Sequence, residues 1–334
     1  MAIEQPRFNV AGAATAPADP PAGHTPRVTI GVPVFNGEKF LERALRSLME
    51  QTFADIEIVV SDNASTDGTE AICRAAMERD SRIRYSRNDR NVGLVMNHRL
   101  VLSQARAQYF MYAPHDDWFA PDYVARCVDV LDRDETVAYV HAETILVDES
   151  GAEIGREMAR QRLDDGSPST RFWDVLVVQG GVNWYGMARR ALLDRIAPYK
   201  PLPRGERIVL AELALWGPFR LLHDDLYYRR IHADQLTSLR VSRKAETLAL
   251  DPSKGSGWRN SMAMLLAEYV LAYALAVTRA PLSPIERLRG YGRVARWIVA
   301  HVPGLGLHDP RTRGLEIHLT GSAPLPAGRE AVGY

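Results

Sequence analysis

The fold of this chain is decided by residues 28–69, VTIGVPVFNGEKFLERALRSLMEQTFADIEIVVSDNASTDGT. Together with Arg27, its first part is a β-branched apolar run at 27–35, typical of a strand buried on both faces. The next part, NGEKFLERALRSLMEQT, places apolar residues at helical spacing, with Asn36 as the predicted N-cap. IEIVVS at 56–61 predicts a second strand, and the capping residues that follow open a second helix. The stretch therefore predicts a strand–helix–strand–helix unit.

The same alternation continues along the chain. A third strand is predicted at RIRYSRN (82–88), a third helix at NVGLVMNHRLVLSQA, and a fourth strand at YFMYA (109–113). Beyond Pro121 the pattern loosens into a helix, a strand, a turn at DESGAEIG, a helix at ERIVLAELALWG (206–217) and a strand at FRLLHDDLYYRRI. We therefore expect an α/β fold with a mostly parallel sheet covered on both faces. A helical region should follow over residues 241–334.

The composition argues against a protein that coats nucleic acid. Lys and Arg total 41, and Asp and Glu also total 41, so the net charge is zero. Cys73 and Cys127 show no metal-ligand spacing and no disulfide framework, which favours a reducing compartment. We accordingly predict no nucleic-acid partner.

Two segments bear on membrane association. Residues 1–26 lack a basic start and a continuous apolar core, so we interpret them as a disordered leader and not as a signal peptide. The run MAMLLAEYVLAYALAV, residues 262–277, is shorter than the roughly 20 residues that span a bilayer, and it contains Glu268. We interpret it as a buried helix. The prediction is a cytoplasmic protein, with contact to the inner face of a membrane and a homodimer left open.

Polar side chains follow all four predicted strands of the first half. In a parallel sheet, ligands bind outside the carboxyl ends of the strands. The residues at the four ends are Pro33, Phe35, Asn36 and Glu38; Asp62, Asn63, Ser65 and Asp67; Asn88, Asn91 and Gly93; and His115, Asp116 and Asp117. Capping or turn chemistry commonly explains one such end, but four at one rim predict a binding site.

The ligand class follows from what the rim lacks. The strand ends carry neither the G-x-G-x-x-G of a dinucleotide fold nor a P-loop. Asp116 and Asp117 are adjacent like charges, and a cation would stabilise them. Magnesium typically takes one or two protein carboxylates together with ligand phosphates. If the ligand carries phosphates, we therefore predict a divalent cation, Mg²⁺ or Mn²⁺, held by Asp116 and Asp117.

Three motifs in order resemble the family 2 glycosyltransferases with the GT-A fold. They are residues 28–69, NVGLVMNHR at 91–99 and PHDDWFAPDY at 114–123. The resemblance continues more loosely to about residue 236 through GERIVLAELALWG and YYRRIH. It implies a GT-A domain over residues 27–240 and an inverting transfer from a nucleoside-diphosphate sugar, UDP or dTDP, to an acceptor hydroxyl. The acceptor would be a carbohydrate, a lipid-linked molecule or a small molecule.

The resemblance also implies roles for single residues. Asp62 falls where the nucleotide base is contacted, and Asp116 falls at the last position of a D-x-D metal motif. Glu206, eleven residues before Gly217, falls at the catalytic base, and we expect the helix N-terminus to hold its pKa down; Asp117 is the alternative base. The other implied contacts are a nucleotide cradle of Pro33, Phe35, Asn36, Glu38 and Asn91, diphosphate or metal support from Arg229, Arg230 and His232, and an acceptor platform of Trp184 and Tyr185.

Two other classes of protein stay open. A nucleotidyltransferase also uses a carboxylate-bound metal, although PVFNGEKF is a poor version of its glycine-rich and basic loop. A nucleotide-sugar-binding protein without catalysis is consistent with Pro114 and Gly205, where this chain departs from the family pattern. Single residues also have simpler interpretations: Asp62, Asp116 and Glu206 as helix-start acids, Trp184 and Tyr185 as core, and Asp224 and Asp225 as surface residues.

Overall fold

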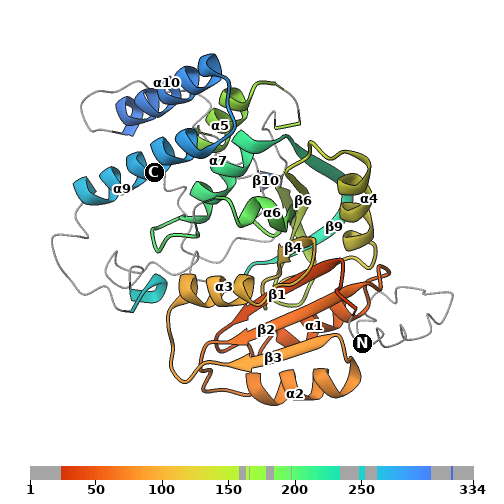
Figure 1. Ribbon diagram of the computed structural model, residues 1–334. Helices are drawn as coiled ribbons and strands as arrows, with labels where there is room; N and C mark the ends of the chain where they lie inside the picture. Colours follow the sequence, from red (N-terminus) through yellow and green to blue (C-terminus); the bar gives the residue numbers. More distant parts are fainter. Residues whose placement is uncertain are drawn as a thin grey trace.

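The computed structural model describes residues 24–157, 163–164, 166–177, 184–196, 198–233, 248–252, 262–301 and 317–318. The protein has a mixed α/β fold, in which helices pack on a central, mostly parallel sheet and further helices follow it (Figure 1). The predicted fold class is thereby confirmed. Residues 1–23 of the predicted leader lie outside the described residues, as does much of the region predicted from residue 241 onward.

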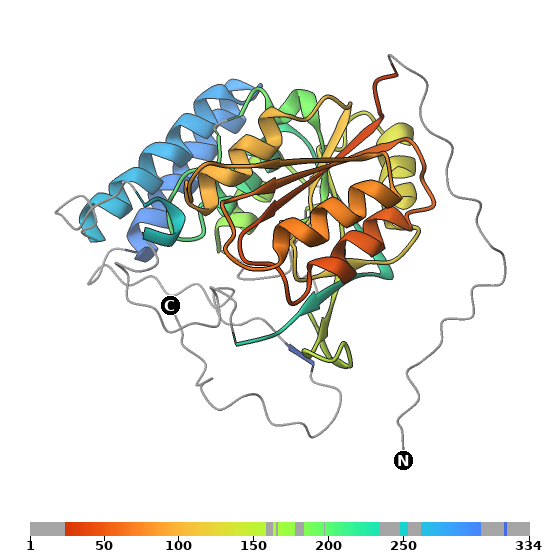
Figure 2. The ribbon, with the colours of Figure 1, turned by 90° about the horizontal axis from the view of Figure 1, so that it is seen from below.

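Four parallel strands form the first half of the sheet, in the order β4-β1-β2-β3. The elements are β1 (Val28–Val34), α1 (Leu41–Met49), β2 (Ile56–Asp62), α2 (Thr69–Arg79), β3 (Ile83–Arg87), α3 (Leu94–Ser103) and β4 (Tyr109–Tyr112). Every residue of β1 is buried, which accounts for its apolar, β-branched sequence. Figure 2 shows α1 and α2 on one face of these strands and α3 on the opposite face.

The first helix begins later than predicted, because Asn36 does not cap it. The backbone of Asn36 takes the left-handed conformation (φ 51°), which asparagine tolerates better than most residues. Its Oδ1 accepts a hydrogen bond from the Thr66 amide (2.9 Å), and its own amide donates to Ser65 Oγ (2.9 Å). Asn36 therefore joins the loop after β1 to the loop after β2, and α1 starts only at Leu41.

The second half of the sheet is built around β6 (Tyr139–Val147). It pairs in parallel with β9 (Phe219–Arg230) and antiparallel with β7 (Glu153–Glu157), the latter across the predicted turn. The short β8 (Met187–Arg189) pairs antiparallel with β4 and with β6, so it joins the two halves. Two short strands remain: β5 (Trp118–Phe119) pairs with β9, and β10 (Ile317–His318) pairs with β7. The remaining helices are α4 (Tyr123–Arg133) and α6 (Arg190–Leu193). The sequence does not predict β5 or β8, because two or three residues show no periodicity.

Four helices pack together beyond the second half of the sheet (Figure 1). They are α5 (Pro168–Val177), α7 (Glu206–Trp216), α9 (Met262–Arg279) and α10 (Pro284–His301). Helix α7 is buried from Ile208 to Leu215, and this stretch includes the carboxylate of Glu212. The Arg279 guanidinium donates two hydrogen bonds of 2.7 Å to Glu212. This ion pair ties α7 to α9.

The helix predicted to be buried at residues 262–277 is half exposed. Helix α9 buries Ala272, Tyr273 and Ala276, but Leu271 is 55% exposed and Leu275 is 40% exposed. The sequence misleads here because the outward face of the helix is as apolar as the inward face, so apolar composition does not distinguish them. No helix in the described part of the chain is long and apolar enough to cross a bilayer.

Candidate active site

The loops after β1 and β2 hold one another at the carboxyl end of the sheet. The Gly37 amide donates to Thr69 Oγ1 (2.8 Å), and the Glu38 amide donates to Asp67 Oδ2 (3.0 Å). These bonds reinforce the contacts that Asn36 makes and leave the Phe35 ring 43% exposed. The rim therefore offers an exposed aromatic ring on a loop that is fixed by hydrogen bonds.

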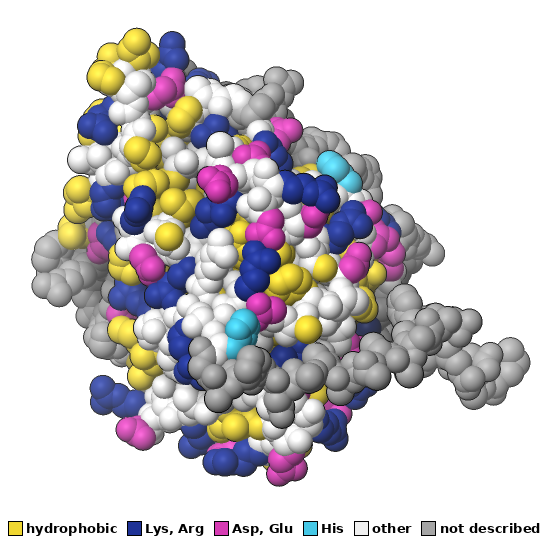
Figure 3. Space-filling view, turned by 45° about the vertical axis from the view of Figure 1, so that its right-hand side comes forward, with side chains coloured by type: hydrophobic (Ala, Val, Ile, Leu, Met, Phe, Trp, Pro, Cys, Tyr) yellow, Lys and Arg dark blue, Asp and Glu magenta, His cyan; other side chains and the backbone are white. Residues whose placement is uncertain are grey.

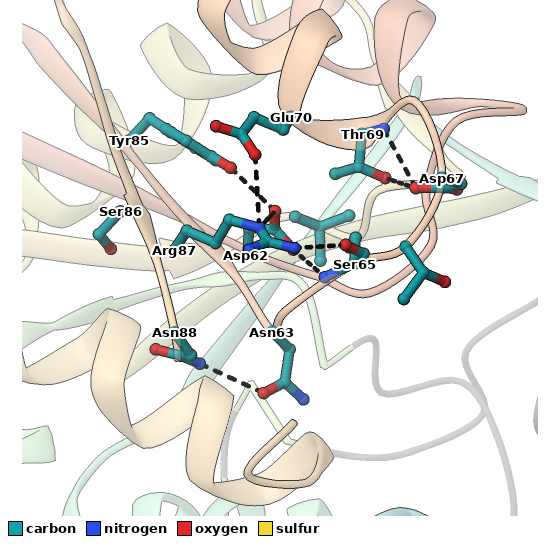
Figure 4. A network of polar contacts seen from close by, with 12 residues as sticks. Asp62, Asn63, Ser65, Asp67, Thr69, Glu70, Tyr85, Ser86, Arg87 and Asn88 are labelled. Atoms are coloured by element: carbon teal, nitrogen blue, oxygen red, sulfur yellow. Dashed lines mark hydrogen bonds and ion pairs between the residues drawn. The ribbon is translucent and has the colours of Figure 1, made fainter. Parts of the chain in front are cut away.

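Asp62, the last residue of β2, lies at the centre of a polar network (Figure 4). Its side chain is fully buried: Oδ1 accepts from the Ser65 amide (2.8 Å), and Oδ2 accepts from the Tyr85 hydroxyl (2.8 Å). Arg87 Nε lies 3.3 Å from the same Oδ2 and 3.5 Å from Glu70. Burial and the hydrogen bond to Asp62 raise the pKa of Tyr85, so its hydroxyl stays protonated. Both oxygens of Asp62 are thus engaged, and Arg87 and Glu70 are the partly exposed members of the network.

Asparagine side chains link the ends of β2 and β3 to α3. Asn63 Nδ2 donates to Asn91 Oδ1 (2.9 Å), and Asn88 Nδ2 donates to Asn63 Oδ1 (3.2 Å) and to Asn97 Oδ1 (3.1 Å). Gly93 has φ 88°, and a Cβ there would lie 2.5 Å from a proline ring, so this position requires glycine. The strand-end pattern indicates Asn63, Asn88 and Asn91, whereas Asn97 lies inside a helix and carries no such signal.

The two adjacent aspartates after β4 serve different contacts. Asp117 is only 4% exposed and accepts hydrogen bonds from the Tyr227 hydroxyl and from the Arg230 amide (2.8 Å). Burial, and then the charge of Asp116, raise the pKa of Asp117 to about 8. Asp116 Oδ2 lies 3.0 Å from His232 Nε2, and Asp116 O accepts from Arg230 Nε (3.1 Å). Strand β9 and the residues after it therefore hold both aspartates.

Asp116 and His232 together offer two ligands of the kind that metals take. Both side chains are largely buried, at 15% and 6% exposure. The Phe40 ring packs 4.8 Å from the His232 ring, and the Arg230 guanidinium lies 4.3 Å from the Phe40 ring centre. The described residues contain no group of three or more His, Cys, Asp or Glu side chains placed to hold a metal. A cation at this pair would therefore need further ligands from a bound molecule.

A third carboxylate, that of Glu206 at the first position of α7, lies within electrostatic range of Tyr185, as Asp116 and Asp117 do. Burial, and then the negative charges of Asp116, Asp117 and Glu206, raise the pKa of Tyr185, so this ring lies within electrostatic reach of all three acids. Tyr199 Oη lies 3.5 Å from Glu206 Oε2. Burial also raises the pKa of Glu206 itself and outweighs the hydrogen bond from its own backbone amide. The prediction of a lowered pKa at the helix N-terminus is wrong, because desolvation dominates.

Trp184 extends the aromatic wall beside Tyr185. Its ring stacks on Tyr112, with centroids 5.3 Å apart and planes 22° apart, and tilts against Tyr199 at 5.4 Å. Trp184 and Tyr185 are both half-buried. Trp184 packs against the core between α5 and α7 and against the small cluster under α3. The two residues thus belong partly to the core and partly to the surface near Glu206.

The two arginines at the end of β9 have different partners. Arg229 Nη1 pairs with Glu157 Oε1 of β7 at 2.9 Å. Arg230 Nη1 donates to Glu149 O (2.6 Å), and its guanidinium lies 5.0 Å from the ring centre of Trp118. Arg230 therefore clamps the Asp116 loop against the turn between β6 and β7. The acidic pair earlier in β9 is exposed and forms ion pairs at the surface, as predicted: Asp224 with Arg126, and Asp225 with Arg156.

Comparisons with known proteins identify the family of this chain. The family model described as glycosyl transferase family 2 matches residues 29–196, half of the chain. The chain belongs to this family.

Among its relatives, the glycosyltransferase GlyA of Streptococcus pneumoniae is 38% identical over 98 residues, 29% of this chain and 14% of the relative. The GalNAc(5)-diNAcBac-PP-undecaprenol β-1,3-glucosyltransferase of Campylobacter jejuni is 25% identical over 170 residues, 51% of this chain and 53% of the relative. This family 2 glycosyltransferase thus spans no more than about half the length of either relative.

A solved structure shares the fold. TarS residues 1–349 of S. aureus, in complex with UDP, matches with a TM-score of 0.59 at 18% identity, covering 82% of this chain and 71% of that chain. This likeness confirms the expected GT-A fold.

In this family 2 glycosyltransferase, the structure brings part of the predicted site together. Asp116 contacts His232 and Arg230, and Tyr185 lies within electrostatic range of Asp116, Asp117, Arg229 and Glu206. The residues Phe35, Asn36, Glu38 and Asn91 lie on the loops along the rim. Pro33 is buried within β1, and Arg229 also pairs with Glu157. The sequence does not indicate Tyr85, Arg87, Tyr199 or Tyr227, because ordinary aromatic and basic residues of strands and loops acquire these contacts only in the folded chain.

Proposed function

We propose that this glycosyltransferase catalyses an inverting transfer from a nucleoside-diphosphate sugar to an acceptor hydroxyl. The observation that carries the proposal is that the Asp116–His232 pair and Glu206 lie within reach of one side chain, Tyr185. Groups suited to a diphosphate and a carboxylate suited to accept a proton therefore lie within electrostatic range of the same ring. General-base transfer of a sugar needs these two functions close together.

The donor nucleotide, in this proposal, lies along the loops after β1, β2 and β3. Phe35 offers an exposed ring for stacking, and the hydrogen-bonded loops keep it in place. Asp62 would accept the N3–H of uracil or thymine after Arg87, 3.3 Å from its Oδ2, moves aside. The UDP complex of TarS supports UDP as the donor nucleotide, and dTDP presents the same N3–H.

The pair of Asp116 and His232 offers one oxygen and one nitrogen ligand to a divalent cation, a mixed set that suits Mn²⁺ better than Mg²⁺. Asp116 would supply a carboxylate oxygen and His232 an imidazole nitrogen, while diphosphate oxygens would complete the shell. When bound, Mg²⁺ or Mn²⁺ would act as a Lewis acid on the diphosphate. Asp117, whose oxygens both bond to β9, fixes the loop that carries Asp116. We therefore assign Asp117 a positioning role and Glu206 the role of base.

The transfer itself needs no covalent intermediate. Glu206 takes the proton of the acceptor hydroxyl while the acceptor oxygen bonds to C1 of the sugar. The bond between C1 and the diphosphate oxygen breaks on the opposite side, and the nucleoside diphosphate leaves with the electron pair. The positive charge of Arg230, held beside Asp116 by its hydrogen bond to Asp116 O, stabilises the leaving group.

The acceptor, in this proposal, approaches from the side of Trp184 and Tyr185. Partly exposed aromatic rings suit the apolar faces of sugar rings. The C. jejuni relative is named for a glycan linked to an undecaprenol diphosphate. This name supports a lipid-linked saccharide ahead of a free carbohydrate or a small molecule.

The test combines binding with turnover. UDP-, dTDP- and GDP-sugars are compared by thermal shift and by release of nucleoside diphosphate, with Mn²⁺ and with excess EDTA. We expect selective stabilisation by a UDP- or dTDP-sugar, about 2.7 kcal/mol at 100 times the dissociation constant, and release that EDTA abolishes.

Three outcomes would contradict the proposal. Binding without release in every acceptor mixture would favour a non-catalytic binding protein. Pyrophosphate release from nucleoside triphosphates would favour a nucleotidyltransferase. An NMR spectrum of the product that shows the anomeric configuration of the donor would exclude inversion.

A further inference from the structure

The hairpin of α9 and α10 presents large apolar side chains to solvent. They are Leu271 (55% exposed), Leu275 (40%), Ile285 (65%), Leu288 (74%) and Tyr291 (39%). In the described part of the chain, these are five of the nine exposed large hydrophobic side chains, so the exposure is concentrated in one hairpin. Clustered exposed apolar residues mark an interaction surface, whereas single ones are ordinary.

Helical spacing and one contact between the helices make this surface continuous. Leu271, Leu275 and Thr278 follow one another along α9 at intervals of four and three residues. Along α10, Ile285, Leu288 and Tyr291 follow one another at intervals of three residues. Thr278 Oγ1 and Tyr291 Oη lie within hydrogen-bond distance, 2.9 Å apart, so the two stripes meet. We call this surface the α9–α10 face; it consists of Leu271, Leu275, Thr278, Ile285, Leu288 and Tyr291.

The charges beside the α9–α10 face are mainly positive. Residues 262–301 contain five arginines and two glutamates and no lysine or aspartate, a net charge of +3 in a chain whose total is zero. Glu286 faces α5, where its Oε2 accepts from the Ser169 amide (3.1 Å). Arg289, one helical turn after Ile285, is 62% exposed and pairs with Glu286 Oε1 at 2.7 Å. Arg296 is exposed two turns further on, and its guanidinium lies 4.7 Å from the ring centre of Trp173. Figure 3 shows hydrophobic side chains beside Lys and Arg along its upper left edge, the side on which α9 and α10 lie in Figure 1.

We propose that the α9–α10 face binds the surface of a bilayer that contains anionic lipids. Leu271, Leu275 and Leu288 enter the headgroup region, and Arg289 and Arg296 contact lipid phosphates. Interfacial helices combine an apolar face with flanking basic residues, and this hairpin has both. A second copy of the chain fits less well, because a two-fold contact through this face would bring the arginines of both copies together.

Binding through this face would orient the protein with α9 between the lipid and α7. Helix α9 packs on α7, the helix that Glu206 begins, and the Tyr269 hydroxyl of α9 donates a hydrogen bond to Pro203 O, three residues before Glu206. The hairpin therefore braces the segment that carries the proposed base. This orientation suits an acceptor presented from a membrane. Only the orientation rests on the proposed function; the lipid binding itself does not.

Vesicle sedimentation of the full chain, without any donor or acceptor, tests the proposal. We expect the protein to sediment with vesicles of phosphatidylcholine mixed with phosphatidylglycerol, but not with phosphatidylcholine alone, and binding should fall as salt screens the surface charge. The L271E/L288E variant should lose at least about tenfold in vesicle affinity, and R289Q/R296Q about tenfold or more. Met77→Glu is the matched control, since Met77 is an exposed apolar residue (39%) on α2, and it should bind as the wild type does.

Two results would overturn the proposal. One is a wild type that does not sediment with anionic vesicles, or that sediments no better than L271E/L288E. The other is a wild-type dimer, seen by light scattering, that Leu288→Glu dissociates while vesicle binding is absent, which would make the face an interface between copies. A thermal melt confirms that each variant folds, and Leu288→Ser replaces L271E/L288E if that variant does not. Vesicle binding by a protein that transfers no sugar would support the docking surface and count against the proposed function alone.

Discussion

The two halves of the molecule hold their site residues in different ways. In the first half, contacts join neighbouring loops, as in the bond between Asn36 and Thr66, 30 residues apart. In the second half, contacts span the chain, as in the bond between Arg230 and Asp117, 113 residues apart. The first half is therefore assembled from successive strand–loop–helix units, whereas the second half exists only after distant segments have met.

This difference separates the two parts of the proposed reaction. The nucleotide rim is complete within the first half, because its loops hold one another. The proposed metal ligand His232 and the proposed base Glu206 come from the second half: His232 lies 3.0 Å from Asp116, and Glu206 lies within electrostatic range of Tyr185. Substitutions of Asp116, His232 or Glu206 should therefore affect turnover more than nucleotide binding.

The largest expected effect is that of Asp116→Asn, which keeps the shape of the side chain and removes its charge. Metal-dependent transfer should fall by about 1000-fold or more, because Lewis-acid stabilisation is worth several kcal/mol. Steady-state rates over a titration of Mn²⁺ measure it. Asp224→Asn, an exposed acid paired with Arg126, is the matched control and should keep the wild-type rate. A wild-type enzyme that works equally fast in excess chelator would remove the metal from the proposal.

Glu206→Gln has the next largest expected effect. It tests whether the second half supplies the general base of the transfer reaction. Transfer should fall by at least about 100-fold, the usual loss of general-base help, while calorimetry should find nucleotide affinity unchanged. The control is Glu135→Gln at an exposed position. If Glu206→Gln transfers at nearly the wild-type rate while Asp117→Asn does not, the base is Asp117 and the comparison of the two halves changes.

Arg279→Met tests whether long-range ion pairs, such as the one between Arg279 and Glu212, stabilise the second half. It leaves the buried carboxylate of Glu212 without its guanidinium, and we expect a loss of about 2–3 kcal/mol in the free energy of unfolding, less than for a fully buried pair because Arg279 is partly exposed. Arg133→Met, which breaks an exposed pair with Asp129, should cost no more than about 0.5 kcal/mol. Equal urea midpoints for the two variants would show that the Arg279–Glu212 pair contributes no more to stability than the exposed Arg133–Asp129 pair.

The smallest effect is a shift in the pH profile of transfer. Because burial raises the pKa of Glu206, the base takes up its proton, and activity falls, at a higher pH than for an ordinary glutamate, whose pKa is about 4.3. Below that raised pKa the rate should fall about tenfold per pH unit, since only the ionised fraction can accept a proton. If the pKa fitted to the low-pH side of the pH–rate profile is at or below the ordinary glutamate pKa, Glu206 is solvated or is not the base.

The sequence predicts the first half well and the second half unevenly. The alternation over residues 28–113 places all four strands and three helices, and the strand-end pattern indicates the rim that the structure shows. It fails at Asn36, whose left-handed backbone depends on the loop after β2, and at β5 and β8, which are too short to show a period. The position of Glu206 follows from the motif spacing, but its raised pKa does not.

By itself, the sequence determined the alternating sheet and the polar rim, because strand period, helix period and turn chemistry act over a few residues. Its three motifs indicated the family by resemblance. Only the tertiary structure decided that Asp117 bonds to β9 while Asp116 meets His232, and that one face of α9 is open to solvent. The physical reason is that burial and ion pairing depend on partners far along the chain. Two adjacent aspartates are alike in sequence until a distant strand donates hydrogen bonds to one of them, and an apolar helix looks the same on both faces until its neighbours cover only one.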